Sequence, residues 1–339
     1  MQLLHFCERD TKMRTVFPTR RLALLALSTC ALAQAPLLHA QIADYPSKPV
    51  KFVNAFTPGG PTDVLARSLG EALQTQFKQP FIVENKPGAA GNIGADMVAK
   101  SPADGYTVMI GIDTTFTVNP HIYPSMPFKQ GDLKPLMVLA TSGMMVVAHP
   151  STGFKSLADM VTAGKSKGVN FSSAGNGSPG HLAAEVLGNA TGTKIQHIPY
   201  KGNAPAANAV LAGEVDGGVL AAPTMLQHIK AGKITALAVT SRQRSKVAPD
   251  VPTVAEAGYP QLVQEILYVA MVPAAMPEPL MQTLQRGMLE ALRSPDIQAR
   301  LTALDLQVDG SVGAAASKRL ADLSAQYGRI AKATNMKVD

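Results

Sequence analysis

The sequence has no tryptophan, and its only two cysteines, Cys7 and Cys30, lie within the first 40 of its 339 residues. That leading segment has the features of a removable signal, so the remaining chain is expected to carry neither thiol nor disulfide. Its stability must then come from a buried hydrophobic core. With 46% hydrophobic and 16% charged residues, the composition is that of an ordinary globular protein with room for two domains.

The sequence also lacks any continuous apolar run of about 18 residues, the length that a membrane-spanning helix needs. The apolar run 22–32 is shorter, follows paired arginines and precedes Ala40, a small residue suited to cleavage. This arrangement predicts a secretory signal over residues 1–40, in which 1–12 is an upstream extension. We therefore expect export to the periplasm, by either the general or the twin-arginine route.

The excess of positive charge is mild. The formal net charge is +7; residues 1–40 hold five basic and two acidic residues, so 26 basic and 22 acidic residues remain, a net charge of +4. The basic residues are scattered and are not interleaved with aromatic residues, so we expect no nucleic-acid binding. A small positive surplus favours anionic solutes, although a solvated surface explains it equally well.

Short apolar runs alternate with helical patterns after residue 44. The runs that predict strands are 50–56, 81–84, 106–111, 136–148, 169–173, 195–200, 217–221 and 234–240. Between them lie apolar stripes at a spacing of four, formed by Leu65, Leu69, Leu73 and Phe77 and by Leu182, Val186 and Ala190. This alternation predicts an α/β fold with mainly parallel sheets, in which ligands bind at the carboxyl ends of strands.

A glycine-rich turn, the first glycine turn, covers residues 56–63 after the first predicted strand. Gly59 and Gly60 permit a tight turn, and Thr62 is expected to cap the following helix. The free amides at the start of that helix, together with its dipole, suit a carboxylate ligand. Asp63 is acidic, so it is expected to brace the turn. A plain capping role for Thr62 and Asp63 is the alternative.

The second glycine turn covers residues 171–181. Its glycines match the spacing G-x-G-x-x-G of dinucleotide sites, but the strand 195–200 ends without the acidic residue that would bind a ribose. We therefore expect no nucleotide and no other cofactor. Ser178 followed by Pro179 provides a helix N-cap and a good first helical residue, which is the more economical explanation.

Ser178 and His181 also suggest a hydrolase, because a serine nucleophile needs a nearby base. The spacing argues against it: Asn176 stands where a G-x-S-x-G elbow has glycine, and a triad histidine normally comes from a distant loop. We expect His181 to orient Ser173 or Asn176, or to cap the helix. No histidine pair has metal-ligand spacing near a carboxylate or thiol, so no metal site is expected.

Several motifs together carry a family resemblance. They are Tyr45-Pro46, Pro58-Gly-Gly-Pro-Thr-Asp63, Val83-Glu-Asn-Lys-Pro-Gly88, Gly91-Asn-Ile-Gly-Ala-Asp96, Asp104-Gly-Tyr106, Ser172-Ser-Ala-Gly-Asn-Gly-Ser178, Pro199-Tyr-Lys-Gly202 and Asp250-Val-Pro-Thr-Val-Ala-Glu-Ala-Gly258. In this order and spacing, from Tyr45 to the C-terminus, the chain resembles the Bug-type extracytoplasmic solute receptors, the substrate-binding proteins of tripartite tricarboxylate transporters.

The resemblance implies a type II periplasmic-binding-protein fold, in which two α/β domains joined by a hinge close on a ligand in the cleft between them. Domain 1 would hold residues 44–141 and 264–339, and domain 2 residues 142–263. In relatives, backbone amides and small polar groups of the two glycine turns bind the carboxylate of the ligand. The corresponding positions are Phe56, Thr57, Gly59, Gly60, Thr62 and Asp63 in the first glycine turn and Ser173, Ala174, Gly175, Asn176, Gly177, Ser178 and His181 in the second.

The resemblance further implies a monomeric receptor and no enzyme. Such a receptor captures a small carboxylate, for example a di- or tricarboxylate or an aromatic acid, and presents it to the membrane permease of a tripartite transporter. A sensor protein is the alternative partner, since receptors for transport and for signalling look alike in sequence. A serine hydrolase that uses Ser178 is the alternative from another class.

Some positions near the expected cleft depart from the family pattern. Leu220 and Ala221 replace an Asp-Asn pair, which argues against an amino group on the ligand. Leu267 precedes Tyr268 where relatives have Trp-Tyr, so the pocket is expected to be roomier or more aliphatic there. Tyr268 is predicted either to close over the ligand or to pack beside the hinge. Lys201 is predicted either to attract a second carboxylate or to be a solvated turn residue.

Overall fold

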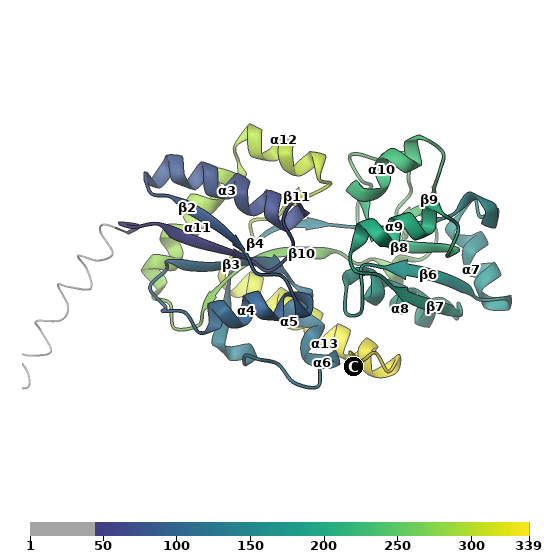
Figure 1. Ribbon diagram of the computed structural model, residues 1–339, viewed down its shortest axis with the longest axis horizontal. Helices are drawn as coiled ribbons and strands as arrows, with labels where there is room; N and C mark the ends of the chain where they lie inside the picture. The colour runs from purple at the N-terminus through teal and green to yellow at the C-terminus, as the bar shows by residue number, and fades with distance from the viewer. Residues whose placement is uncertain (1–44, 339) are drawn as a thin grey trace, which may run out of the picture. The chain divides into compact units, whose positions relative to one another are not determined.

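The strands form two sheets in the computed structural model, which describes residues 45–338 (Figure 1). The six-stranded sheet has the order β11-β4-β10-β3-β1-β2. Its strands are β1 (Val50–Asn54), β2 (Phe81–Asn85), β3 (Thr107–Ile112), β4 (Leu133–Ser142), β10 (Ile266–Pro273) and β11 (Gln307–Val308). The five-stranded sheet has the order β7-β6-β8-β5-β9. Its strands are β5 (Met144–Ala148), β6 (Val169–Ser173), β7 (Ile195–Pro199), β8 (Gly217–Ala221) and β9 (Thr235–Val239).

Helices cover both faces of each sheet, as Figure 1 shows. Around the six-stranded sheet lie α3 (Pro61–Phe77), α11 (Glu278–Leu292) and α12 (Pro295–Ala303) on one face and α4 (Asn92–Ala99), α5 (Thr114–Thr117), α6 (Asn119–Ile122) and α13 (Gly313–Ala333) on the other. We call this group the six-stranded lobe. The five-stranded lobe has α9 (Asn203–Leu211) and α10 (Ala222–Lys230) on one face and α7 (Leu157–Ser166) and α8 (Pro179–Thr191) on the other. Short 3₁₀ turns are η1 (Ala89–Gly91), η2 (Gln130–Asp132), η3 (Pro150–Thr152) and η4 (Pro260–Leu262).

The pairing within the sheets is mixed, so the prediction of mainly parallel sheets is wrong. Strand β1 pairs in parallel with β2 and β3, and β6 with β7 and β8, but β10 runs antiparallel to β3 and β4, and β5 antiparallel to β8 and β9. The exceptions involve strands adjacent to the points where the chain passes from one sheet to the other. The predicted α/β fold itself is confirmed.

The apolar run 136–148 forms two strands, β4 and β5, which belong to different sheets. Gly143 separates them. A Cβ atom at this position would lie 2.7 Å from the Ser241 Oγ atom and 2.8 Å from the Ser241 amide nitrogen, so the two crossing segments pass too closely for any other residue. The chain passes from the six-stranded sheet to the five-stranded sheet at Gly143 and returns in the segment before Ile266, which we call the second crossing. The exact domain limits at 141/142 and 263/264 stay a prediction.

Each lobe has its own hydrophobic core. Leu65, Leu69 and Leu73 of the predicted stripe are fully buried in α3, whereas Phe77 is half-buried. In α8 the stripe is only partly as predicted, because Leu182 is fully buried but Ala190 is exposed. The five-stranded lobe packs its core around residues that include Met145, Val147, Val210, Leu220 and Met225.

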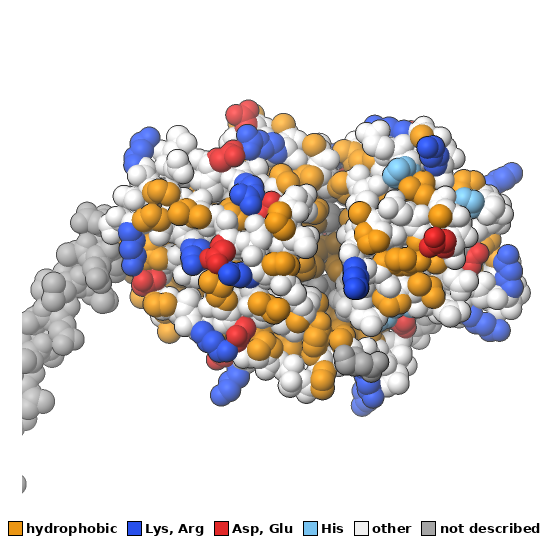
Figure 2. Space-filling model, viewed as in Figure 1, with side chains coloured by type: hydrophobic (Ala, Val, Ile, Leu, Met, Phe, Trp, Pro, Cys, Tyr) orange, Lys and Arg blue, Asp and Glu red, His pale blue; other side chains and the backbone are white. Residues whose placement is uncertain are grey.

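A further cluster joins the two lobes. Val118 and Ile122, at the ends of α5 and α6, pack with Leu182 of α8 and with Tyr327 and Ala331 of α13. Figure 2 shows a hollow between the two lobes, with hydrophobic side chains beside it and Lys and Arg scattered over the whole visible surface. Pro46–Asp339 belong to one compact unit; of the other, Met1–Tyr45, only Tyr45 is described. The predicted signal segment 1–40 lies outside the described residues.

Candidate ligand site

The first glycine turn joins β1 to α3 at the carboxyl end of β1. Helix α3 begins at Pro61, and its N-cap is Gly60, which supplies no side-chain cap. The expected cap by Thr62 is therefore wrong: proline suits the first helical position because its missing N–H is not needed there, so the helix starts at Pro61 and the N-cap is Gly60, two residues before Thr62. Thr62 is a buried residue of the first helical turn. Since Gly60 offers no side-chain acceptor, the first helical amides point their partial positive charge out of the helix end.

Asp63 braces the first glycine turn, as predicted. Its carboxylate accepts hydrogen bonds from the Gly59 amide at 2.9 Å, from Arg67 Nε at 3.0 Å and from Asn85 Nδ2 at 2.8 Å. Burial raises the pKa of the Asp63 carboxyl, but the hydrogen bonds from Arg67, Gly59 and Asn85 outweigh it, and the net pKa is below the usual value. Asn85 also donates to the Phe56 carbonyl at 3.2 Å. This carboxylate is therefore occupied within the turn.

The second glycine turn joins β6 to α8 at the carboxyl end of β6. Ser178 is the N-cap and Pro179 the first helical residue, as predicted, and the Ser178 hydroxyl accepts from the His181 amide at 3.2 Å. The same hydroxyl donates to Ser173 Oγ at 3.3 Å. Its hydrogen bonds among the described residues do not include the imidazole of His181. The pair therefore lacks the contact that a serine nucleophile and its base require.

Gly177 is where the second glycine turn meets the six-stranded lobe. Its φ is +75°, and a Cβ atom there would lie 2.8 Å from Ile122 Cδ1 and 3.7 Å from Asn119 Oδ1. Only glycine combines this conformation with so close an approach. Asn119 is fully buried, and its Oδ1 atom has no hydrogen-bond partner among residues 45–338.

Two stacked histidines lie under the second glycine turn. The rings of His181 and His197 have centroids 3.8 Å apart and are within 8° of parallel. His181 Nδ1 accepts from the Gly177 amide at 3.1 Å, and His197 Nε2 lies 2.6 Å from Ser173 Oγ. Burial, and then the neighbouring His181, lower the pKa of His197 to about 4, although Glu185 opposes them.

These contacts define the role of His181 and add His197 to the residues of the candidate site. His181 does not hold Ser173 or Asn176; it accepts from the Gly177 amide just before the N-cap, which agrees with the alternative expectation of a capping role. The side chain that holds Ser173 is His197. His197 was not among the predicted site residues, because it lies on the next strand, β7. Parallel pairing of Phe171 with His197 places His197 on the same face as Ser173, so the strand register was the signal that could have found it.

A third segment, the turn η1, borders the first glycine turn and was also missed. Ala89 and Ala90 adopt left-handed conformations with φ of 46° and 49°, which cost roughly 1–3 kcal/mol each for residues other than glycine. The Ala90 carbonyl accepts from Thr115 Oγ1 at 2.9 Å and from Asn119 Nδ2 at 3.1 Å. Strain of this kind is held by its surroundings and is typical of ligand-binding segments.

The remaining predicted positions differ in exposure. Thr57, Asn176 and Lys201 are exposed, and Ala174 is half-buried. Leu220 has no exposed surface and packs in the core of the five-stranded lobe. Ala221, the N-cap of α10, donates its amide to Asn203 Oδ1 at 3.2 Å.

Tyr268 is buried in β10. Its hydroxyl lies 3.4 Å from Ser142 Oγ, and burial raises the pKa of that hydroxyl to about 12. This environment favours the packing role over closure on a ligand. The two residues belong to the paired strands β10 and β4, next to the crossings between the lobes.

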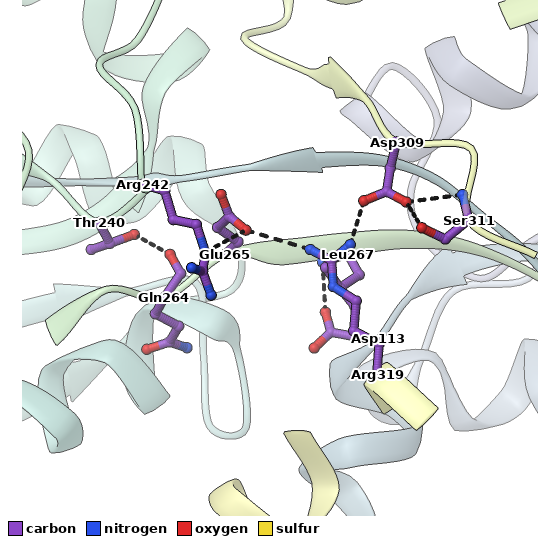
Figure 3. A network of polar contacts seen from close by, with 9 residues as sticks. All are labelled: Asp113, Thr240, Arg242, Gln264, Glu265, Leu267, Asp309, Ser311 and Arg319. Carbon is purple, nitrogen blue, oxygen red and sulfur yellow. Dashed lines mark hydrogen bonds and ion pairs between the residues drawn. The ribbon is translucent and has the colours of Figure 1, made fainter. Parts of the chain in front are cut away.

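A polar network extends along the second crossing (Figure 3). Arg319 of α13 pairs with Asp309 and, at 3.4 Å, with Glu265, which also lies 4.0 Å from Arg242. Asp113 accepts from the Leu267 amide at 2.9 Å, and complete burial raises the pKa of Asp113 to about 7.

Beside this network lies a cavity of about 490 Å³, lined by residues of the second crossing, such as Gln264, and by residues of α13, such as Tyr327. None of its lining residues belongs to the glycine turns. Across residues 45–338 there is no group of three or more His, Cys, Asp or Glu side chains that could hold a metal ion. Nor is any helix in that range long and apolar enough to cross a membrane.

The chain crosses twice between two α/β lobes, and each lobe has a glycine turn at the carboxyl end of a parallel strand. This architecture defines a ligand-binding protein of the type II periplasmic-binding-protein fold. Residues 65–336 match the family described as "Tripartite tricarboxylate transporter family receptor". The chain belongs to this family, which consists of solute-binding receptors and not of enzymes. The hydrolase alternative therefore has support neither from the Ser178 geometry nor from the family.

Individual relatives agree with this assignment. Protein BugT of Bordetella pertussis is 37% identical over 276 residues, covering 80% of this chain and 85% of BugT. Among solved structures, an R. palustris protein with adipate is 29% identical with a TM-score of 0.78, covering 86% of this chain and 99% of that one. The periplasmic binding protein BugD is 30% identical with a TM-score of 0.75 and the same two coverages. MatC from Rhodopseudomonas palustris, with bound malate, is 25% identical with a TM-score of 0.74, covering 84% and 99%.

Proposed function

We propose that this receptor captures a small carboxylate, in particular a dicarboxylate, in the periplasm and presents it to the membrane permease of a tripartite transporter. The observation that supports this most is the pair of glycine turns, each of which ends in the N-terminus of a helix, α3 or α8. Oriented amides and helix dipoles stabilise an anion without a buried arginine. Relatives solved with adipate and malate supply the ligand class.

In this proposal the ligand lies between the two glycine turns. The first glycine turn offers the amides that follow Gly60, where no side chain caps the helix. The second offers the turn from Ala174 to Gly177, of which Asn176 is exposed. Lys201 is exposed beyond the end of β7 and supplies a positive charge for a second carboxylate. Leu220 and Ala221, which replace the Asp-Asn pair of the family pattern, leave carboxylate binding by the backbone amides intact, because neither has a charged side chain.

Closure is proposed to occur about the two crossings. Gly143 and the segment before Ile266 carry the chain between the lobes, so a rotation there brings the two glycine turns together. Differential affinity for the closed state is what drives such a rotation. A sensor protein in place of a permease would bind the same closed form of the receptor. Deletion of the receptor distinguishes the two partners, because solute uptake is lost only if the partner is a permease.

The test is a thermal-shift screen followed by calorimetry. The purified protein is unfolded and refolded to remove carried-over ligand, then mixed with adipate, malate, a tricarboxylate, an aromatic acid and the diamides of the diacids. A ligand at 100 times its dissociation constant adds about 2.7 kcal/mol to the free energy of unfolding. Stabilisation by an acid and not by its amide supports the proposal. Stabilisation by the amides alone, or by none of the acids, contradicts the carboxylate assignment.

A further inference from the structure

The hydroxyl of Ser173 sits at the centre of the second glycine turn and has four polar neighbours. It accepts from the Gly175 amide at 3.2 Å and from the Ser178 hydroxyl at 3.3 Å, and it lies 3.2 Å from the Gly175 carbonyl and 2.6 Å from His197 Nε2. A hydroxyl has two lone pairs and one proton. Since two donors occupy the lone pairs, Ser173 Oγ cannot accept a third hydrogen bond; it donates to the Gly175 carbonyl at 3.2 Å, and the His197 nitrogen at 2.6 Å can act only as an acceptor. His197 Nε2 is therefore unprotonated, and the ring proton is on Nδ1.

His181 has the opposite arrangement. A backbone amide can only donate, so the Gly177 amide at 3.1 Å requires a lone pair on His181 Nδ1. The ring proton of His181 is then on Nε2, which faces Glu185 Oε1 at 3.6 Å. Each histidine thus presents an acceptor nitrogen to the second glycine turn, one to Gly177 directly and one to Gly175 and Ser178 through Ser173.

The stacked geometry disfavours a proton on His197. A proton on His197 would place a positive charge 3.8 Å from the centre of the His181 ring, and His181 is buried while His197 is half-buried. The low pKa of His197 agrees with this, since burial and His181 both disfavour its charged form. Glu185, on the same helix as His181, is an acidic group that opposes them.

We infer that His181 and His197 are positioning residues for ligand binding: as neutral, stacked acceptors they fix the second glycine turn in the shape that receives the carboxylate. The inference rests on the proposed function for its ligand. Neither ring needs to touch the ligand, because each acts through a backbone amide or a serine hydroxyl of the turn.

Protonation removes both hydrogen bonds. A protonated Nδ1 of His181 has no lone pair for the Gly177 amide. A protonated Nε2 of His197 becomes a third donor to Ser173, whose two lone pairs are already taken by Gly175 and Ser178. Acidification is therefore expected to loosen the second glycine turn and to weaken ligand binding, beyond the effect of protonating the ligand itself.

Matched pairs of variants separate the acceptor nitrogen from the stacked ring. His181→Asn keeps an acceptor near the Nδ1 position, whereas His181→Phe keeps the stack and loses the acceptor. His197→Gln keeps a polar group that reaches Ser173, whereas His197→Phe does not. One lost hydrogen bond of this kind corresponds to about a 3- to 10-fold weaker affinity. We expect each Phe variant to show this loss for adipate by calorimetry, and the Asn and Gln variants to recover most of it.

Hydrogen exchange of the Gly177 amide tests the same inference without any ligand. His181→Phe should raise its exchange rate, while His181→Asn and a control at a distant histidine, His228→Asn, should leave it slow. In addition, nitrogen NMR should show the Nε2–H tautomer for His181 and the Nδ1–H tautomer for His197. Reversed tautomers, or a Gly177 amide that stays protected in His181→Phe, would overturn the inference.

The pH profile of adipate affinity completes the test. Between pH 7 and pH 4 the wild-type protein should lose more affinity than His197→Phe, because protonation of the ligand is common to both and only the wild-type protein also protonates His197. Equal losses would contradict the positioning role. If the wild-type protein binds no adipate, the proposed function fails for that probe, while the exchange and tautomer measurements still decide the inference.

Discussion

The two glycine turns occupy equivalent places in their lobes but are held by different chemistry. The first is braced by a buried carboxylate, Asp63, with Arg67 and Asn85 around it. The second is held by neutral groups, Ser173 and the two stacked histidines. A helix N-terminus ready for an anion can thus be built with or without a formal charge beneath it. The two halves of the site should therefore respond differently to mutation and to pH.

The largest effect should follow removal of the charge under the first glycine turn. Asp63→Ala takes away three hydrogen bonds from a side chain that is almost fully buried, and it leaves the Gly59 amide without that acceptor. We expect the free energy of unfolding to fall by about 3 kcal/mol, measured by urea denaturation. Asp322→Ala, which removes an exposed carboxylate paired with Lys318, is the control and should cost about 0.5 kcal/mol or less. Equal costs for the two variants would contradict the bracing role of Asp63.

A smaller effect should follow from filling the close approach at the second glycine turn. Gly177→Ala combines a φ of +75° with a contact of 2.8 Å to Ile122 Cδ1, and about 2 kcal/mol of destabilisation is expected in thermal unfolding. Gly192→Ala has a φ of +70° and nothing within 4 Å, so its cost of about 1 kcal/mol isolates the backbone contribution. Adding Ile122→Val should recover part of the difference. If Ile122→Val recovers no stability, the contact between Gly177 and Ile122 is not what destabilises Gly177→Ala.

The pH dependence of stability sharpens the contrast between the turns. The folded-state pKa of His197 is about 4 against 6.5 for the unfolded chain, so the unfolded state binds more protons in this window. Its contribution to stability is present above pH 6.5 and is lost as the pH falls to about 4, at no more than about 1.4 kcal/mol per pH unit. The pKa of Asp63 is lowered from 3.8, so its contribution is lost only at more acid pH. Denaturation of the wild-type protein and of His197→Phe between pH 4 and pH 7 measures the difference. Parallel curves would contradict the assignment.

Local signals in the sequence identified the caps and turns of the site. Ser178 with Pro179 marks its own N-cap, and Asp63 was recognised as a brace from its charge at a helix start. Partners contributed by other strands were not found. Asn85 and His197 depend on the register of β1 with β2 and of β6 with β7, which pattern alone does not supply.

At the crossings between the lobes, too, the sequence predicts elements better than it predicts which strands pair. A long apolar run, 136–148, carries no periodicity that separates β4 from β5, and Gly143 is the only mark of the boundary. Strand β10 was not among the strands read from the apolar pattern, and its place between β3 and β4 depends on pairing across more than a hundred residues. Sequence reasoning therefore found the elements more readily than their partners.

The place of β10 also has a consequence for the order of folding. Strands β3 and β4 lie on either side of it, so until Ile266–Pro273 arrive both have an unpaired edge. During synthesis the six-stranded sheet cannot complete its central pairing until the whole five-stranded lobe has been made. The five-stranded lobe, in contrast, takes all of its strands from one continuous stretch, Met144–Val239. We expect the inserted lobe to be able to mature first, and the lobe that begins the chain to be the slower one because its central pairing is long-range.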